Sequence, residues 1–130
     1  MDAEDFRAMV GGIEQSNFGG PDGDTKLSLE KEEGFLTILE DVKVLARANS
    51  DDKLLMVIGL KNTNRTVAVT GDGINDIEAL EHSDVGLAMG SGCSAAKNAS
   101  SLILADDDFE SAIRAVMWGR NIYHNVGRFL

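Results

Sequence analysis

The sequence has few of the residues that cross-link or interrupt a fold. Its 130 residues include one cysteine and one proline. With one cysteine, no disulfide can form within the chain, which fits a reducing compartment. Cys93 lies in the segment GSGCSA with no histidine nearby in the sequence. We therefore interpret it as a small packing residue and not as a nucleophile.

Basic residues and long apolar runs are also scarce. Twelve Lys and Arg residues against 22 Asp and Glu leave a formal net charge of −10, which disfavours a nucleic-acid partner or an acidic membrane surface. The longest apolar run, residues 54–60, is too short to span a bilayer. The first residues show no signal-peptide pattern. We expect a soluble chain with one core, because its composition is that of an ordinary globular protein.

The region from residue 42 to residue 118 predicts an α/β fold with a parallel sheet and flanking helices. Strands that alternate with helices are typical of βαβ units. Apolar runs predict the strands, and helical spacing of apolar residues predicts the helices. The predicted strands are 42–46, 67–69, 84–89 and 101–105, and the helices follow Asn49, Asp76, Gly92 and Asp108.

Residues 1–41 form a separate N-terminal part in this prediction. Asp2 caps a helix over 3–10, residues 11–34 are polar and predict a long loop or insertion, and 35–40 predict a short helix. Asp22–Thr25 also suggests a calcium loop or a phosphoryl-accepting motif. The calcium loop lacks its turn glycine, and no apolar strand precedes Asp22, so ordinary turn chemistry explains the segment.

The stretch TVAVTGDGINDIEAL, residues 66–80, carries the main chemical signal. It predicts a strand, a loop with Asp72 and Asp76, and then a helix. Open α/β sheets bind ligands at the carboxyl ends of their strands. Two carboxylates beside helix-opening N–H groups suit Mg²⁺ carrying phosphate. An ordinary turn capped by Asp and Asn is the alternative.

Lys53 is the candidate cation for the same site. It falls in the first turn of the helix that follows Asn49, where a positive charge opposes the helix dipole. A lysine just past a strand end can reach a phosphate on that edge of the sheet. The alternative is an ordinary surface lysine. We interpret His82 as a solvent-facing residue near a helix end.

The last helical pattern follows Asp106–Asp108 and continues to the final residues. Its apolar residues keep helical spacing through Trp118, Ile122 and Val126, and it ends at Leu130 without a stop signal. We therefore expect this chain to be part of something longer.

Five segments together resemble the C-terminal half of the phosphorylation domain of P-type ATPases. That domain has a haloacid-dehalogenase-like Rossmannoid fold, which would be incomplete here. The resemblance covers roughly residues 40–130 and is greatest to plasma-membrane-type calcium-transporting ATPases. The segments are VLARANSDDK (44–53), VAVTGDGIND (67–76), DVGLAMGSG (84–92), ASSLILADDDF (99–109) and AVMWGRNIYHNVGRFL (115–130).

The resemblance implies a role for each candidate residue. Asp72 matches the carboxylate that coordinates Mg²⁺, and Asp76 matches the second acidic residue that supports the site and the ion. Asn75 matches a residue that hydrogen-bonds near the acyl phosphate, and Lys53 matches the lysine that neutralises the phosphoryl group. The parent would use ATP, with this chain facing the cytosol and residues 119–130 starting a helix toward a membrane span.

Two motifs of that family are missing, and one position departs from it. The sequence has no DKTGT, which carries the phosphorylated aspartate, and no upstream TGD; Ile77–Glu78 replaces a small residue and proline. The resemblance thus implies half a site, inactive alone. Its partners would be the nucleophile-bearing strand, the nucleotide-binding domain and the membrane helices.

An exposed sheet edge predicts marginal stability or self-association of this chain. A non-catalytic binding module and a soluble phosphatase of the same fold are the alternatives.

Overall fold

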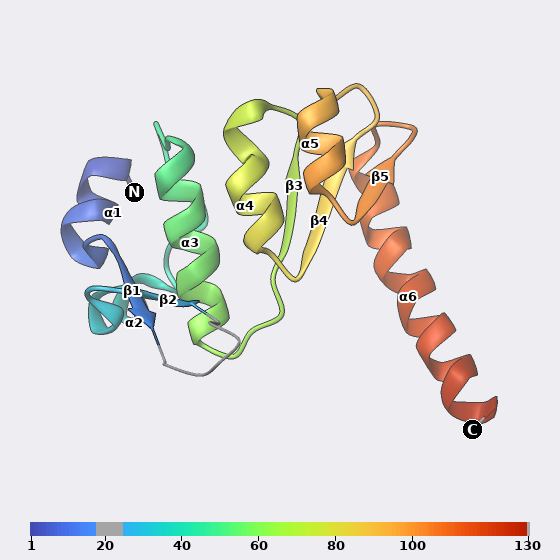
Figure 1. Cartoon of the computed structure of the whole chain (residues 1–130), viewed down its shortest axis with the longest axis horizontal. Helices are drawn as coiled ribbons and strands as arrows, with labels where there is room; N and C mark the ends of the chain where they lie inside the picture. Colours follow the sequence, from blue (N-terminus) through green and yellow to red (C-terminus); the bar gives the residue numbers. More distant parts are fainter. Residues whose placement is uncertain (18–24, 130) are drawn as a thin grey trace.

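The computed structural model describes residues 1–17 and 25–129, and Figure 1 shows their arrangement. Helix α3 lies between α1 on one side and α4 with the three-stranded sheet on the other, while α6 extends away from both. The elements are α1 (Ala3–Val10), β1 (Ile13–Asn17), β2 (Thr25–Leu29), α2 (Glu32–Ile38), α3 (Ser50–Asn62), β3 (Ala68–Gly71), the 3₁₀ helix η1 (Ile74–Asp76), α4 (Ile77–His82), β4 (Val85–Met89), α5 (Ser94–Ala99), β5 (Leu102–Leu104) and α6 (Phe109–Phe129).

Strands β3, β4 and β5 form the parallel sheet that the sequence predicts. The strand order is β3-β4-β5, with Ala68 opposite Val85 and Leu87 opposite Leu102. Helices α4 and α5 connect these strands and pack against β3 and β4. The α/β prediction is therefore confirmed. Because β3 lies at one edge of this sheet, its carboxyl end and the loop that follows are positioned at that edge.

An antiparallel hairpin occupies part of the segment predicted as a loop. Strand β1 pairs with β2, with Ile13 opposite Leu29 and Gln15 opposite Leu27. The prediction of a loop throughout 11–34 is wrong, because Ile13, Leu27 and Leu29 share one face of the hairpin and pack on the core. Their polar neighbours obscure this alternation in the sequence. The two sharper interpretations of Asp22–Thr25 depend on residues 18–24, which lie outside the described part.

The larger core lies between α1, α2, α3 and the hairpin. The apolar residues of α1 fall three and four positions apart, which places them on one helix face toward this core. The rings of Phe6 and Phe35 meet edge to face with centroids 6.4 Å apart. Burying one such side chain contributes roughly 1.5–3 kcal/mol to the stability of the fold. The buried members are Phe6, Val10, Leu29, Phe35, Ile38, Leu54, Leu55 and Ile58.

Residues 42–46 do not form the buried strand that the sequence predicts. Val44 is 71% exposed, and the segment makes only an isolated parallel bridge between Ala46 and Asp2. The N–H of Ala46 donates to the carbonyl of Met1, and the N–H of Ala3 donates to the carbonyl of Ala46. The prediction is wrong because a strand requires a ladder of partners, and this segment finds only one bridge among the described residues.

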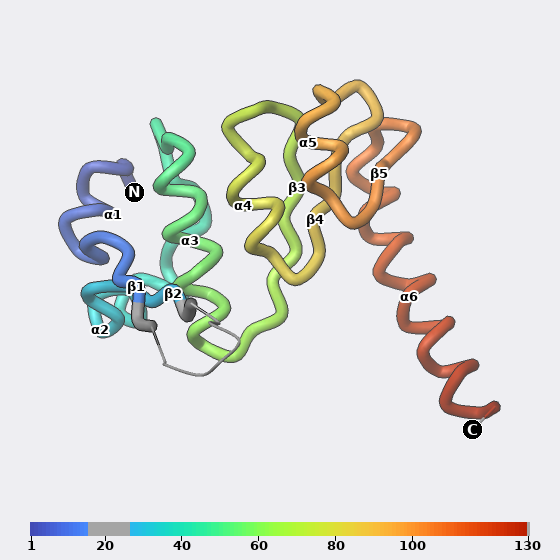
Figure 2. The backbone as a smooth tube through the Cα atoms, viewed as in Figure 1, coloured from blue at the N-terminus to red at the C-terminus, as the bar shows by residue number. Residues whose placement is uncertain are grey.

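Helix α6 is a continuous helix of 21 residues, none of them buried. Asp108 caps its start by accepting a hydrogen bond from the N–H of Glu110 at 3.0 Å, as its position predicts. Figure 2 shows α6 carrying the C-terminus far from the N-terminus. No helix in the described ranges is both long enough and apolar enough to cross a membrane.

Asp84 links the start of β3 to the end of α3. Its carboxylate accepts a hydrogen bond from the Val67 N–H at 2.8 Å and pairs with Lys61 at 3.3 Å. Lys61 also donates to the carbonyl of His82 at 2.8 Å. The Val67 hydrogen bond and then the contact with Lys61 lower the pKa of Asp84 below its ordinary value of 3.8, although partial burial raises it.

We predict that Asp84→Asn destabilises the chain more at neutral pH than in acid. A carboxyl whose pKa is lowered by folding contributes stability above its unfolded pKa and loses that contribution as the pH falls through its folded value. We expect the free energy of unfolding to fall by about 0.5–1 kcal/mol at pH 7, after allowing for solvent screening. Urea unfolding at pH 7 and at pH 3 measures it. The exposed Asp41→Asn is the control, and an equal loss at both pH values contradicts the prediction.

Candidate functional site

The loop after β3 folds back so that the carboxylate of Asp76 contacts the backbone of Asp72 and Gly73. The Oδ2 atom of Asp76 accepts hydrogen bonds from the N–H groups of Asp72 at 3.3 Å and Gly73 at 3.2 Å. The 3₁₀ helix η1 makes this reversal, and α4 continues from it. The structure thus brings Asp72 and Asp76 into one loop at the carboxyl end of β3, as the sequence predicts.

Lys53 reaches the same loop from α3. Its Nζ donates to Oδ1 of Asp76 at 2.6 Å, and the side chains of Lys53 and Asp76 are 39% and 13% exposed. Helix α3 begins a few residues before Lys53, at Ser50, and Asn49 and Asp52 form a reciprocal capping box there. The contact joins residues that are 23 positions apart. Lys53 is therefore not an isolated surface lysine.

Asp76 keeps its negative charge because its partners outweigh its burial. Burial raises the pKa of this carboxyl. The hydrogen bond from Lys53 and those from the N–H groups of Gly73 and Asp72 lower the pKa by more than burial raises it. The net result is a pKa below the ordinary value of 3.8. The Lys53–Asp76 pair is consequently ionic at neutral pH.

The side chains of Asp72 and Asn75 are exposed beside this pair. The backbone of Asp72 is held from the other side, since its carbonyl accepts a hydrogen bond from the Cys93 N–H at 2.8 Å. Cys93 also caps α5, with its Sγ accepting from the N–H of Ala96 at 3.4 Å. Cys93 thus has a structural role, although the sequence did not show that it contacts the Asp72 loop.

The donor set fits a hard cation that obtains most of its ligands from elsewhere. Both oxygens of Asp76 already accept hydrogen bonds, whereas the carboxylate of Asp72 makes no such contact with any described residue. No three His, Cys, Asp or Glu side chains in the described ranges gather as a metal site. Mg²⁺ commonly uses one or two carboxylates plus water and substrate phosphate, so this loop fits half of a magnesium site.

A cavity of about 430 Å³ opens between α3 and β3, next to the Lys53–Asp76 pair. Since β3 is an edge strand, the backbone on this side has no neighbouring strand among the described residues. Sequence patterns did not reveal the cavity, because it depends on how α3 packs beside β3. Its lining is mainly apolar and includes Leu45, Met56, Val57, Leu60, Val67, Val69 and Ala79.

Comparison with known protein families matches residues 52–117 to the family described as haloacid dehalogenase-like hydrolase. Calcium-transporting ATPase 10, plasma membrane-type, of Arabidopsis thaliana is 48% identical over 72% of this chain and 9% of its own length. Plasma membrane calcium-transporting ATPase mca-1 of Caenorhabditis elegans is 44% identical over 98% of this chain and 10% of its own. P-type sodium-transporting ATPase4 of Toxoplasma gondii is 46% identical over 76% of this chain and 8% of its own.

A solved structure supports the fold. The catalytic domain of the CPx-ATPase CopB-B aligns with a TM-score of 0.54 and 19% identity, over 80% of this chain and 57% of that one. This chain spans about a tenth of the length of the relatives it matches, so it corresponds to one part of each of them.

We predict that Gly71→Ala disrupts the loop while Gly73→Ala is tolerated. A Cβ at position 71 would lie 2.5 Å from the Cβ of Asp76, whereas at position 73 the nearest atom would be 3.7 Å away. Gly73 has a φ of −109°, which alanine adopts without strain. Gly71→Ala should therefore displace Asp76 and cost about 1–3 kcal/mol, as overpacking typically does. Urea unfolding compares the two variants, and equal losses contradict the prediction.

Proposed function

This chain belongs to the haloacid dehalogenase-like hydrolase family, and we propose that it supplies the magnesium- and phosphate-binding half of the aspartyl-phosphate site of a cation-transporting P-type ATPase. One observation carries the proposal: the 2.6 Å Lys53–Asp76 pair lies at the carboxyl end of β3, beside the exposed carboxylate of Asp72. An anion that approaches this end of the sheet meets a lysine held in place and a loop that has one carboxylate open to a cation.

Each residue then has a separate task. Lys53 neutralises charge on the phosphoryl oxygens, and Asp76 holds Lys53 and the loop amides in position. Asp72 binds the metal, with Asp76 as its acidic neighbour, and Asn75 donates a hydrogen bond to the phosphoryl group. Mg²⁺ supplies charge neutralisation and a template for the phosphate. This division suits phosphoryl transfer, which depends mostly on positioning and charge stabilisation.

The nucleophile comes from outside this chain. A covalent phosphoenzyme requires an acceptor, and Asp72 occupies the metal position. Asp106 also follows a strand, but its oxygens accept hydrogen bonds from the Asp108 N–H and the Ser111 hydroxyl, and β5 is at the opposite edge from β3. The open edge of β3 and the apolar cavity beside it favour pairing with the nucleophile-bearing strand of the parent.

The parent couples ATP hydrolysis to cation transport, and we favour calcium as the cation. Relatives from plants and a nematode are named as calcium-transporting ATPases. The Toxoplasma relative is named as sodium-transporting and is equally similar in sequence. The ion ligands would lie in membrane helices of the parent, and α6 would lead toward one of them, as part of the cytosolic side of a membrane protein.

A binding module without catalysis is the second candidate, and α6 is the observation that favours it. The exposed apolar side chains of this helix include Trp118 at 64%, Tyr123 at 83% and Phe129 at 97%. A helix that exposes several large apolar side chains is typical of an interaction surface, which the rest of the ATPase or another partner would cover. A soluble phosphatase of the same fold has less support, because it needs an acceptor aspartate of its own.

We predict that Asp72→Asn weakens binding of a phosphate-mimicking fluoride in the presence of Mg²⁺. The affinity should fall roughly tenfold to a hundredfold, the effect of losing one charged contact. Calorimetric titration with aluminium fluoride and Mg²⁺ measures the affinity. Asp41→Asn makes the same change of charge at an exposed position outside the site and should match the wild type. Equal affinity of the wild type and Asp72→Asn contradicts the proposed half-site.

We also predict that this chain alone does not become phosphorylated. With Mg²⁺ and radiolabelled ATP, no acid-stable covalent phosphate should accumulate, because the acceptor aspartate is supplied by the parent. Gel autoradiography after acid quenching measures it. Stoichiometric labelling would show that the chain carries its own nucleophile, which is what the soluble phosphatase alternative requires.

A further inference from the structure

Asp52 is the buried charged side chain of the described region, with no exposed surface. A buried carboxylate is costly unless charged and polar partners satisfy it. Nη1 of Arg7 donates to Oδ1 and Oδ2 of Asp52, at 2.9 Å and 2.7 Å. The N–H of Asn49 donates to Oδ2 as well, at 2.9 Å. We call Arg7, Asp52 and Asn49 together the α3 clamp.

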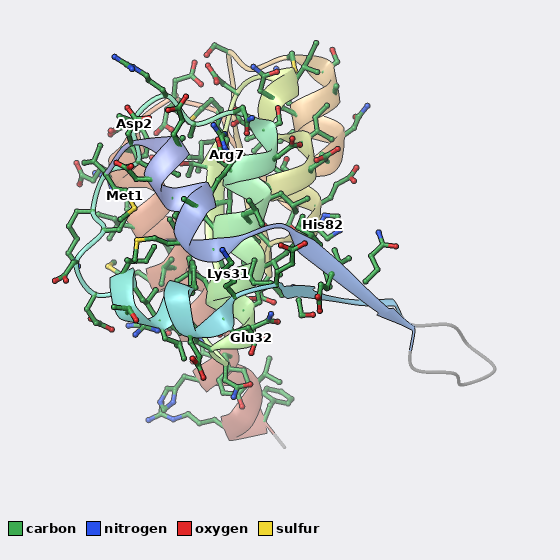
Figure 3. All side chains as sticks on the ribbon, turned by 90° about the vertical axis from the view of Figure 1, so that its left-hand side faces the viewer. Met1, Asp2, Arg7, Lys31, Glu32 and His82 are labelled. Atoms are coloured by element: carbon green, nitrogen blue, oxygen red, sulfur yellow. The ribbon has the colours of Figure 1, made fainter. Side chains whose placement is uncertain are left out.

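The clamp fixes the first turn of α3 to α1. Asn49 and Asp52 cap the helix reciprocally, since the N–H of Asp52 donates to Oδ1 of Asn49 at 2.9 Å. Arg7 belongs to a helix that is itself anchored by the buried side chains of Ala3, Phe6 and Val10. In Figure 3, Arg7 lies between α1 and the start of α3. The clamp therefore connects the first turn of α3 to α1, a helix that is packed in the core.

Lys53 is the residue next to Asp52, and it points toward a different neighbour of α3. Successive side chains on a helix point about 100° apart, so Asp52 meets α1 while Lys53 meets Asp76 in η1. Helix α3 contacts both α1 and η1. A lysine in a first helical turn also opposes the helix dipole, and its long stem has many rotamers. Its direction consequently depends on how firmly this turn is held.

We propose that Arg7 is a positioning residue, which holds Asp52 and thereby fixes the first turn of α3 so that Lys53 points at the Asp72–Asp76 loop. A buried ion pair is a weak source of stability, and apolar residues of similar size often replace it without loss. What apolar residues do not supply is a directional link between α1 and one particular turn of α3. The phosphate role of Lys53 rests on the proposed function, but the action of Arg7 on Lys53 does not.

The test is an NMR experiment on the ammonium group of Lys53 in the 130-residue chain, without metal or phosphate. In the wild type, this group should show a scalar coupling across its hydrogen bond to the Asp76 carboxyl carbon and slow exchange of its protons with water. Arg7→Met should abolish the coupling and speed the exchange roughly tenfold, as expected for loss of a charge-assisted hydrogen bond. Asp76→Ala removes the acceptor of the Lys53 hydrogen bond and defines the fully released signal.

Two further variants separate positioning from stability. Arg7→Lys keeps the charge, and because one nitrogen of Arg7 makes both contacts, it should restore part of the coupling. The double variant with Arg7→Met and Asp52→Asn leaves no buried charge at this position and keeps a side-chain oxygen that accepts from the Asn49 N–H. It should therefore fold but still release Lys53. This variant decides the question if Arg7→Met alone does not fold. The control is Arg65→Met, which breaks the exposed Arg65–Glu40 pair and should leave the Lys53 signal unchanged.

The proposal is overturned if the folded Arg7→Met chain or the folded double variant keeps the wild-type coupling and exchange rate of Lys53. Arg7 would then contribute only to stability. Because the readout contains neither Mg²⁺ nor fluoride, a failure to bind the phosphate mimic leaves this result unaffected. Conversely, a released Lys53 in the variants supports the clamp whether or not the proposed function holds.

Discussion

The ion pair between Lys53 and Asp76 connects the two packed regions of this chain. Lys53 belongs to the helix that forms the core with α1, α2 and the hairpin, while Asp76 belongs to the loop at the edge of the parallel sheet. A small apolar cluster of Val57, Val67 and Ala79 supports the same junction. Asp76 remains charged because hydrogen bonds from Lys53 and the loop amides lower its pKa more than burial raises it, and the 2.6 Å contact ties the loop to α3.

The open edge of β3 is a feature on which the proposed function depends. This region supplies one open carboxylate, a lysine held by Asp76 and an apolar cavity of about 430 Å³ beside the open edge of β3. These features fit a site completed by a second segment that adds a strand and an acceptor. The proposed function therefore concerns a cooperation between this chain and the rest of a larger ATPase, and not an activity that the chain possesses by itself.

The regular elements could be predicted from the sequence because their signals are local. Apolar runs marked β3, β4 and β5, and the TGDGIND segment marked the loop with Asp72 and Asp76. The hairpin was missed because its strands alternate only briefly between polar residues. Residues 42–46 were misassigned because an apolar run does not reveal whether a partner strand is present. The Arg7–Asp52 contact joins residues 45 positions apart, and no local pattern indicates such a pair.

The most direct test of the half-site is to locate a divalent cation on the chain. Mn²⁺ can replace Mg²⁺ as a paramagnetic probe, and it broadens the NMR signals of amides near the site where it binds. The account predicts that residues 71–76 and Cys93 broaden first, and that Asp72→Asn removes this effect. If broadening begins instead at the acidic turn of Asp106–Asp108, or is equal in the wild type and Asp72→Asn, the loop is not a metal site and the account is contradicted.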